Sequence, residues 1–288
     1  MQVIGIDVGR DRVKAVTVGK RVEFRSQVGE WRERRLTAGG NYDVEINGRK
    51  YFVADLAADE SYFVREMSTE SKIHTETQIL FLTALGIVAA AGKAVSIVTG
   101  LPVMQHTPGE KERLLGLLRG PVEIAVNGKR QRLNIDQVGV VPEAGGAYWH
   151  AVLDDGGGLA NTWLSKQRVR VVDIGSRTVN YCTINQRQYI DRDSGTLGYG
   201  IMELHNAEAV PGDAAKEQFA RRVAADLSKR WLRYDPGTDL VLLTGGGALL
   251  LEKWLRQHFP VYQLADDALF ANAIGYYKMG VARCQRQN

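Results

Sequence analysis

One short pattern occurs twice in this chain and constrains the fold more than any other feature. Residues 3–18, VIGIDVGRDRVKAVTV, and residues 168–184, RVRVVDIGSRTVNYCTI, each consist of an apolar run, a glycine turn and a second apolar run. Apolar runs joined by a tight glycine turn predict paired strands. The two copies align without a gap, so Asp7 corresponds to Asp173. We therefore expect two related halves, each opening with a strand-turn-strand unit.

The rest of the chain alternates predicted strands and helices. Asn-Gly turns at 47–48 and 127–128 predict hairpins over 42–54 and 122–135. Further strands are expected at 94–99, 137–141, 189–192 and 240–243, and helices at 76–91, 109–118, from Glu143 onward, and at 197–209, 212–232, 248–258 and 268–283. This alternation predicts α/β sheets covered by helices.

Two domains are predicted. The first comprises 1–153 plus 271–288, with a small strand-rich insertion at about 32–71. The second comprises 154–270, with a helical insertion at about 197–235. The glycine-rich segment Asp154–Gly158 is expected to be a flexible joint between the halves.

Composition excludes several classes of protein. With 44% hydrophobic and 24% charged residues, the chain has the make-up of a globular protein. The longest apolar stretch, 79–91, is shorter than the roughly 18 residues that a spanning helix needs. The start shows no secretory signal pattern, so a cytoplasmic location without a membrane partner is expected. Cys182 and Cys284 lack metal-ligand spacing and are expected to be reduced and structural.

Three segments have residues suited to binding a magnesium nucleotide. An aspartate at a strand end followed by a glycine turn places a carboxylate beside backbone N–H groups, and Asp7 and Asp173 both have this setting. Lys14 is expected to direct its ammonium group toward a phosphate. The glycine run Gly245–Gly247, between a strand and a helix, lets the backbone approach a ligand closely.

Glu143 follows a strand and Pro142, at a predicted strand-to-helix junction. A carboxylate there is suited either to activating an attacking water or to favourable interaction with a helix dipole. The common P-loop and GxGxxG patterns are absent from the sequence, which leaves a two-lobed nucleotide cleft as the expected solution.

Taken in order, these segments resemble the actin, Hsp70 and sugar-kinase superfamily, and most closely its ParM-type bacterial and archaeal actins. The resemblance implies a two-lobed, ribonuclease H-like α/β fold with a nucleotide cleft between the lobes. It implies ATP or GTP and Mg²⁺ as cofactors, with Asp7 and Asp173 holding the metal through water and Glu143 activating the attacking water. The implied nucleotide contacts are Gly9, Lys14, Gly175, Ser176, Thr178, Gly245, Gly246, Gly247, Lys216 and Glu217, with Asp213 as a further candidate for the base or ribose.

The same resemblance implies an ATPase that polymerises head to tail on binding Mg-ATP and disassembles after hydrolysis. A role in plasmid or DNA segregation through a DNA-binding adaptor protein would follow. Arg10, Arg12 and Arg177 stand where relatives have small residues, and either contact phosphate or crowd it. A small-molecule kinase on the same fold, or a scaffold that binds nucleotide without hydrolysing it, remain the alternatives.

Basic runs at 31–35, 129–132 and 229–233 are the strongest local clusters of positive charge. Solvated faces are the preferred interpretation, and direct binding of nucleic acid is the less favoured one. Trp149, Trp163 and Trp254 are expected to pack in the core.

Overall fold

The computed structural model describes residues 1–36, 40–66, 71–207 and 210–286. The chain forms two compact units. The first comprises Met1–Leu101, Thr107–Val140 and Met279–Asn288, and the second comprises Pro102–His106 and Val141–Lys278. The boundaries of the compact units thus differ from the predicted domain boundaries at 153/154 and 270/271. The predicted domains are defined by common descent and not by compactness. The compact units therefore do not test them, and they stay a prediction.

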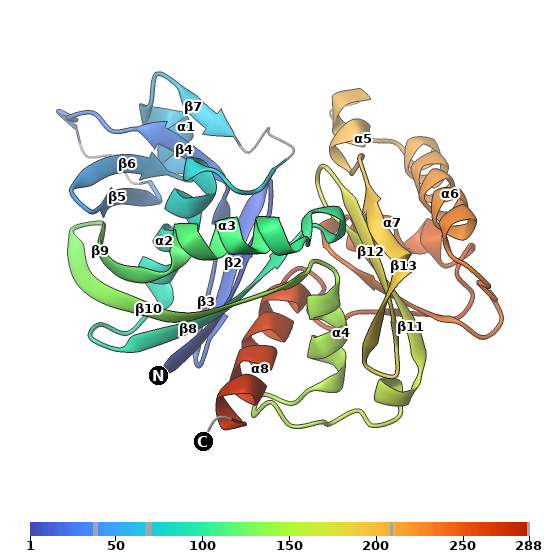
Figure 1. Cartoon of the computed structure of the whole chain (residues 1–288). Helices are drawn as coiled ribbons and strands as arrows, with labels where there is room; N and C mark the ends of the chain where they lie inside the picture. The colour runs from blue at the N-terminus through green and yellow to red at the C-terminus, as the bar shows by residue number, and fades with distance from the viewer. Residues whose placement is uncertain (37–39, 67–70, 208–209, 287–288) are drawn as a thin grey trace. The chain divides into compact units, whose positions relative to one another are not determined.

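A ten-stranded sheet forms the first unit, in the order β3-β2-β1-β8-β10-β9-β5-β6-β4-β7 (Figure 1). Its strands are β1 Gln2–Val8, β2 Arg12–Thr17, β3 Lys20–Arg25, β4 Gln27–Glu30, β5 Tyr42–Ile46, β6 Arg49–Val53, β7 Val64–Glu66, β8 Ala94–Leu101, β9 Gly120–Val126 and β10 Lys129–Pro142. Its helices are α1 Asp55–Glu60, α2 Thr75–Val88 and α3 Pro108–Leu118.

Local sequence explains the hairpins of this unit. Asn47 and Gly48 have φ values of 48° and 81°, and Asn127 and Gly128 have values of 48° and 79°. These left-handed pairs are the turns that Asn-Gly favours, because their twist matches that of the flanking strands. Both predicted Asn-Gly hairpins are therefore confirmed.

Helix α2 supplies much of the first core. It is apolar on most of its surface, and Leu80, Phe81, Ala84 and Leu85 are all buried against the sheet. The predicted helix at 76–91 is thus confirmed, with an earlier end at Val88.

A five-stranded sheet forms the second unit, in the order β13-β12-β11-β14-β15. Its strands are β11 Arg168–Ile174, β12 Val179–Asn185, β13 Gln188–Leu197, β14 Leu240–Thr244 and β15 Tyr262–Leu264. Its helices are α4 Gly145–Val152, α5 Met202–Ala207, α6 Asp213–Arg230, α7 Gly246–Leu255 and α8 Ala271–Gln285, the last of which ends in the first unit, and two 3₁₀ turns lie at Val103–Gln105 (η1) and Leu164–Lys166 (η2).

Both faces of this second sheet are covered. Along β11, Val169 and Val171 belong to one buried cluster, while Val172 and Ile174 belong to another. Successive side chains of a strand point to opposite faces. The first cluster includes residues of α4, and the second includes residues of α6 and α7. The sheet is therefore the middle layer of the unit.

Several sequence-based boundaries were wrong. The strand predicted at 137–141 is the end of β10, which runs without a break from Lys129. The helix predicted from Glu143 begins at Gly145, because Ala144 takes a left-handed φ of 70°. In the predicted helix 197–209, Leu197 instead ends β13, α5 starts at Met202, and residues 208–209 lie outside the described part.

The segment Asp154–Gly158 is not a joint between the two units. It lies wholly inside the second unit. Asp154 closes it as a loop, since the Gly158 N–H donates to Asp154 Oδ1 at 2.8 Å and the Asp154 N–H donates to the Gly158 carbonyl at 2.9 Å.

Within the described ranges 1–36, 40–66, 71–207 and 210–286, we find no helix with the length and apolar character needed to cross a membrane.

Candidate functional site

The first glycine turn lies between β1 and β2 in the first unit. Strand register places Asp7 opposite Lys14 and Val8 opposite Val13. The turn is closed by the Gly9 N–H, which donates to the Arg12 carbonyl at 3.0 Å. The Ser26 hydroxyl donates to the Gly9 carbonyl at 2.6 Å and fixes the turn from β3's end. The strand-turn-strand unit predicted at the start of the chain is confirmed.

Lys72 lies at this turn, and the sequence analysis missed it. The residue is 5% exposed, and its ammonium group donates to the Val8 carbonyl at 2.8 Å. A buried cation at a turn adds positive charge where a phosphate would be received. A single lysine 64 residues away in sequence matches no motif, so only the tertiary structure reveals it.

The second glycine turn, between β11 and β12, repeats the same geometry. Asp173 lies opposite Asn180, and the Gly175 N–H donates to the Thr178 carbonyl at 3.0 Å. The carbonyls of Gly175 and Ser176 accept the N–H groups of Ile201 and Met202 at 3.1 and 2.8 Å. The second turn is thus held by the segment that leads into α5.

The glycine run lies directly beside this second turn. Parallel pairing of β11 with β14 places Thr244 next to Asp173. Gly245 has a φ of 87°, and a Cβ atom there would lie 2.4 Å from Asp173 Oδ1. A Cβ atom on Gly247 would lie 2.3 Å from the Ile174 side chain. Only glycine lets this backbone lie so close to the end of β11.

Glu143 sits in the turn between β10 and α4 and is only 5% exposed. The Asn180 side-chain amide donates to Glu143 Oε2 at 2.8 Å. Asn180 is itself fixed, since its Oδ1 accepts the Thr196 hydroxyl at 2.7 Å. Neither Asn180 nor Thr196 was predicted, because an asparagine and a threonine in strands form no motif. Glu143 precedes α4 instead of lying in its first turn, but it is still next to the N-terminus of that helix, so both predicted roles stay predictions.

The predicted base and ribose contacts lie on α6. Lys216 places its ammonium 5.8 Å from the centre of the Trp254 ring on α7. Glu217 accepts Arg221 at 3.2 Å, and Asp213 accepts Lys253 at 3.0 Å. The structure thus brings the start of α6 to the helix that follows the glycine run, while both acidic residues also serve ordinary surface ion pairs.

The donor set of the second unit fits a magnesium nucleotide. A carboxylate at a strand end supplies the oxygen that Mg²⁺ prefers, directly or through water. Gly245 leaves open a space that a Cβ atom would fill beside that carboxylate. We find the same carboxylate chemistry at Asp7 in the first unit, next to Lys14 and Lys72.

The remaining residues singled out from the sequence differ in exposure. Arg12 is exposed and lies 3.8 Å from Glu23 and 3.7 Å from Asp11, whereas Arg10 and Arg177 are half-buried. In the basic run 129–132, Arg130 pairs with Glu45 and Glu123. Trp254 is buried as expected, but Trp163 is 62% exposed, so its assignment to the core was wrong.

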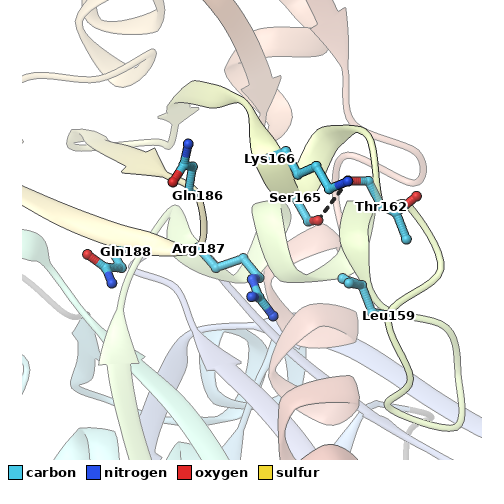
Figure 2. A pocket seen from close by; sticks show the side chains of 7 residues that line it. All are labelled: Leu159, Thr162, Ser165, Lys166, Gln186, Arg187 and Gln188. Carbon is cyan, nitrogen blue, oxygen red and sulfur yellow. Dashed lines mark hydrogen bonds between the residues drawn. The ribbon is translucent and has the colours of Figure 1, made fainter.

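A cavity of about 650 Å³ lies elsewhere in the second unit. Figure 2 shows it between the tip of the β12-β13 hairpin and the segment around η2; its lining residues are Leu159, Thr162, Ser165, Lys166, Gln186, Arg187 and Gln188. None of the predicted site residues lines it, so it is separate from the candidate nucleotide site.

Comparisons with known proteins agree with this geometry. Residues 5–146 match the family of actin-like protein N-terminal domains. A comparison with curated proteins finds no match.

Solved structures share the fold over nearly the whole chain. Apo psk41 ParM superposes with a TM-score of 0.83 at 17% identity, covering 99% of this chain and 98% of the other. A subunit of a 15-stranded ParM filament from Clostridium botulinum gives 0.77 at 21% identity, covering 97% and 98%. An archaeal actin homologue in complex with ADP gives 0.76 at 20% identity, covering 99% and 100%. Residues 5–146 thus match the actin-like family, and the chain has the two-lobed α/β fold seen in the ParM-type actin homologues.

Proposed function

We propose that this protein binds Mg-ATP or Mg-GTP, polymerises head to tail, and disassembles after hydrolysis. The observation that carries the proposal is the pair of strand-turn-strand units, each with an aspartate at its turn, one of which packs against a glycine run. A relative with this fold binds ADP and another forms a filament. These similarities support nucleotide binding and self-association of this chain.

In the proposed site, Asp7 and Asp173 hold the metal through water, and the metal neutralises phosphate charge when bound. Lys14 and Lys72 supply positive charge at the first turn, with backbone N–H groups of Gly9. Gly175, Ser176 and Thr178 receive phosphate at the second turn, and the Gly245–Gly247 backbone, with Lys216 and Glu217, receives the nucleoside. Each role uses the backbone and side-chain positions described above.

Glu143 is proposed to orient the attacking water and accept its proton. Its burial and the amide donor from Asn180 keep one carboxylate oxygen fixed. A fixed carboxylate costs little reorganisation when a proton moves to it. From the resemblance to ParM-type actins, we propose a cytoplasmic role in DNA segregation through an adaptor protein.

Light scattering and pelleting test this proposal, with purified protein in Mg-ATP, Mg-GTP, Mg-ADP or no nucleotide, and with phosphate release followed in parallel. Polymer that forms with a triphosphate and decays as phosphate is released is expected. Tight binding without polymer would favour a kinase or a scaffold instead.

Glu143→Gln isolates the hydrolytic step, because glutamine can still accept the Asn180 amide but cannot take a proton. We expect phosphate release to fall by about 100-fold or more while assembly with Mg-ATP persists. Glu143→Ala should also slow release. Glu252→Gln is the matched control, since Glu252 accepts one neutral donor, the Tyr262 hydroxyl, at 3.1 Å. An unchanged rate in Glu143→Gln would exclude the proposed role.

A further inference from the structure

Asn272, on the first turn of α8, joins two parts of the candidate site. It is 6% exposed. Its Nδ2 donates to Asp173 Oδ2 at 2.8 Å, and its Oδ1 accepts the Ala147 N–H of α4 at 3.1 Å. We propose that Asn272 is a positioning residue that holds the Asp173 carboxylate in place for Mg²⁺; this inference rests on the proposed function.

The orientation of the Asn272 amide is fixed by chemistry. A backbone N–H can only donate, so the group that faces Ala147 must be the carbonyl oxygen. The NH₂ group then has to face Asp173. The amide therefore cannot flip without losing both bonds, and its NH₂ group stays directed at the Asp173 carboxylate.

Close packing of α4 and α8 allows Asn272 to make both hydrogen bonds. A Cβ atom on Gly146 would lie 2.7 Å from the Asn272 Cα, and one on Gly275 would lie 1.8 Å from the Gly146 carbonyl. Figure 1 shows α4 and α8 side by side where these glycines meet. Since neither position tolerates a side chain, the backbone of Asn272 is held close against α4.

A neutral donor suits a metal-binding carboxylate better than a cation does. A lysine or arginine in place of Asn272 would add a positive charge beside Asp173 and compete with Mg²⁺, whereas an amide orients the carboxylate and adds no charge. Partners that orient metal-binding carboxylates typically change metal affinity or activity by about 10- to 100-fold when removed.

The test measures binding by following a fluorescent ATP analogue as Mg²⁺ is added. For Asn272→Ala we expect the Mg²⁺ concentration of half-saturation to rise by about tenfold. Affinity for the analogue in EDTA should stay within about twofold of wild type, because the metal-free nucleotide does not depend on the Asp173 orientation. Asn161→Ala is the control: Asn161 Oδ1 also accepts a backbone N–H of the second unit, from Leu164 at 2.9 Å, so a general loss of stability would appear in it too.

A double-mutant cycle shows whether Asn272 acts through Asp173. If it does, Asn272→Ala has no further effect in an Asp173→Ala background. Independent, additive effects would overturn the proposal, as would unchanged Mg²⁺ dependence in folded Asn272→Ala.

Asn272→Asp is a second variant, for the case that Asn272→Ala misfolds. Its carboxylate still accepts the Ala147 N–H, so α4 keeps its anchor, but Asp173 receives a like charge in place of a donor. A change of about fivefold or more in the Mg²⁺ half-saturation is expected, and a value within twofold of wild type would overturn the proposal. Failure of wild type to bind the analogue at any Mg²⁺ concentration would instead reject the proposed function itself.

Discussion

The two glycine turns have the same backbone but different chemical surroundings. In both, an aspartate is the next-to-last residue of the first strand, and a glycine N–H donates to the carbonyl three residues on. At the position opposite the aspartate, the first turn has Lys14 and the second has Asn180. Buried partners of the first turn include the Lys72 ammonium and the Ser26 hydroxyl, while those of the carboxylates in the second unit include the amides of Asn180 and Asn272.

This difference shows how a repeated backbone takes on two tasks. Cations around the first turn favour a polyanion such as phosphate. At the second turn, the amides of Asn180 and Asn272 orient the carboxylates of Glu143 and Asp173. The strand-turn-strand geometry thus sets where groups are placed, and a few side chains set which charges they meet.

The glycines of the two turns differ in the space around them. Substituting these glycines should therefore give the largest change in stability. A Cβ atom on Gly9 would lie 2.5 Å from the Arg12 carbonyl, whereas one on Gly175 would lie 3.2 Å from the Thr178 carbonyl. Gly9→Ala is expected to lower the free energy of unfolding by about 2–3 kcal/mol, and Gly175→Ala by about 1 kcal/mol or less. Urea unfolding of both variants measures this, and equal losses would mean that the turns are equally tight.

Substitutions of the two side chains opposite the aspartates should differ in their effects, one mainly on stability and the other mainly on nucleotide binding. Asn180→Ala leaves the buried Glu143 without its amide donor and is expected to cost about 1–3 kcal/mol of unfolding free energy. Lys14→Ala at the equivalent half-buried position should cost less than about 0.5 kcal/mol.

Nucleotide titrations complete this comparison. Lys14→Ala should weaken binding of the triphosphate by about tenfold, the effect of one charge-assisted hydrogen bond. Should Lys14→Ala destabilise the fold as much as Asn180→Ala does, the division of tasks between the turns would be wrong.

Substitutions in the β2-β3 and β12-β13 hairpins, which follow the two glycine turns, should give the smallest change in stability. Gly19 and Arg187 occupy equivalent positions in them, with φ values of 68° and 69°. A left-handed conformation costs a non-glycine residue roughly 1 kcal/mol. Arg187→Gly is therefore expected to stabilise the protein by about 0.5–1 kcal/mol, and Gly19→Ala, which meets no atom within 4 Å, to destabilise it by about 1 kcal/mol.

Thermal or urea unfolding measures both hairpin variants. No gain in Arg187→Gly would mean that contacts of the Arg187 side chain beside the cavity offset its backbone strain. Arg187→Ala, which removes these contacts and keeps the strain, is the control.

The sequence by itself determined the features that depend on neighbouring residues. Asn-Gly pairs and glycine turns set the hairpins, because few other residues adopt their φ values. Alternating apolar residues in β11 set its two buried faces. The carboxylates Asp7, Asp173 and Glu143 were likewise visible from their positions at strand ends.

Only the tertiary structure decided what surrounds those carboxylates. Lys72 reaches Val8 across 64 residues, Asn180 reaches Glu143 across 37, and Asn272 reaches Asp173 across 99. It also decided that α4 starts after Glu143 and that Trp163 is exposed. Lone lysines and asparagines have no periodicity or spacing of their own, so their partners are set by how strands and helices pack, and packing depends on the whole chain.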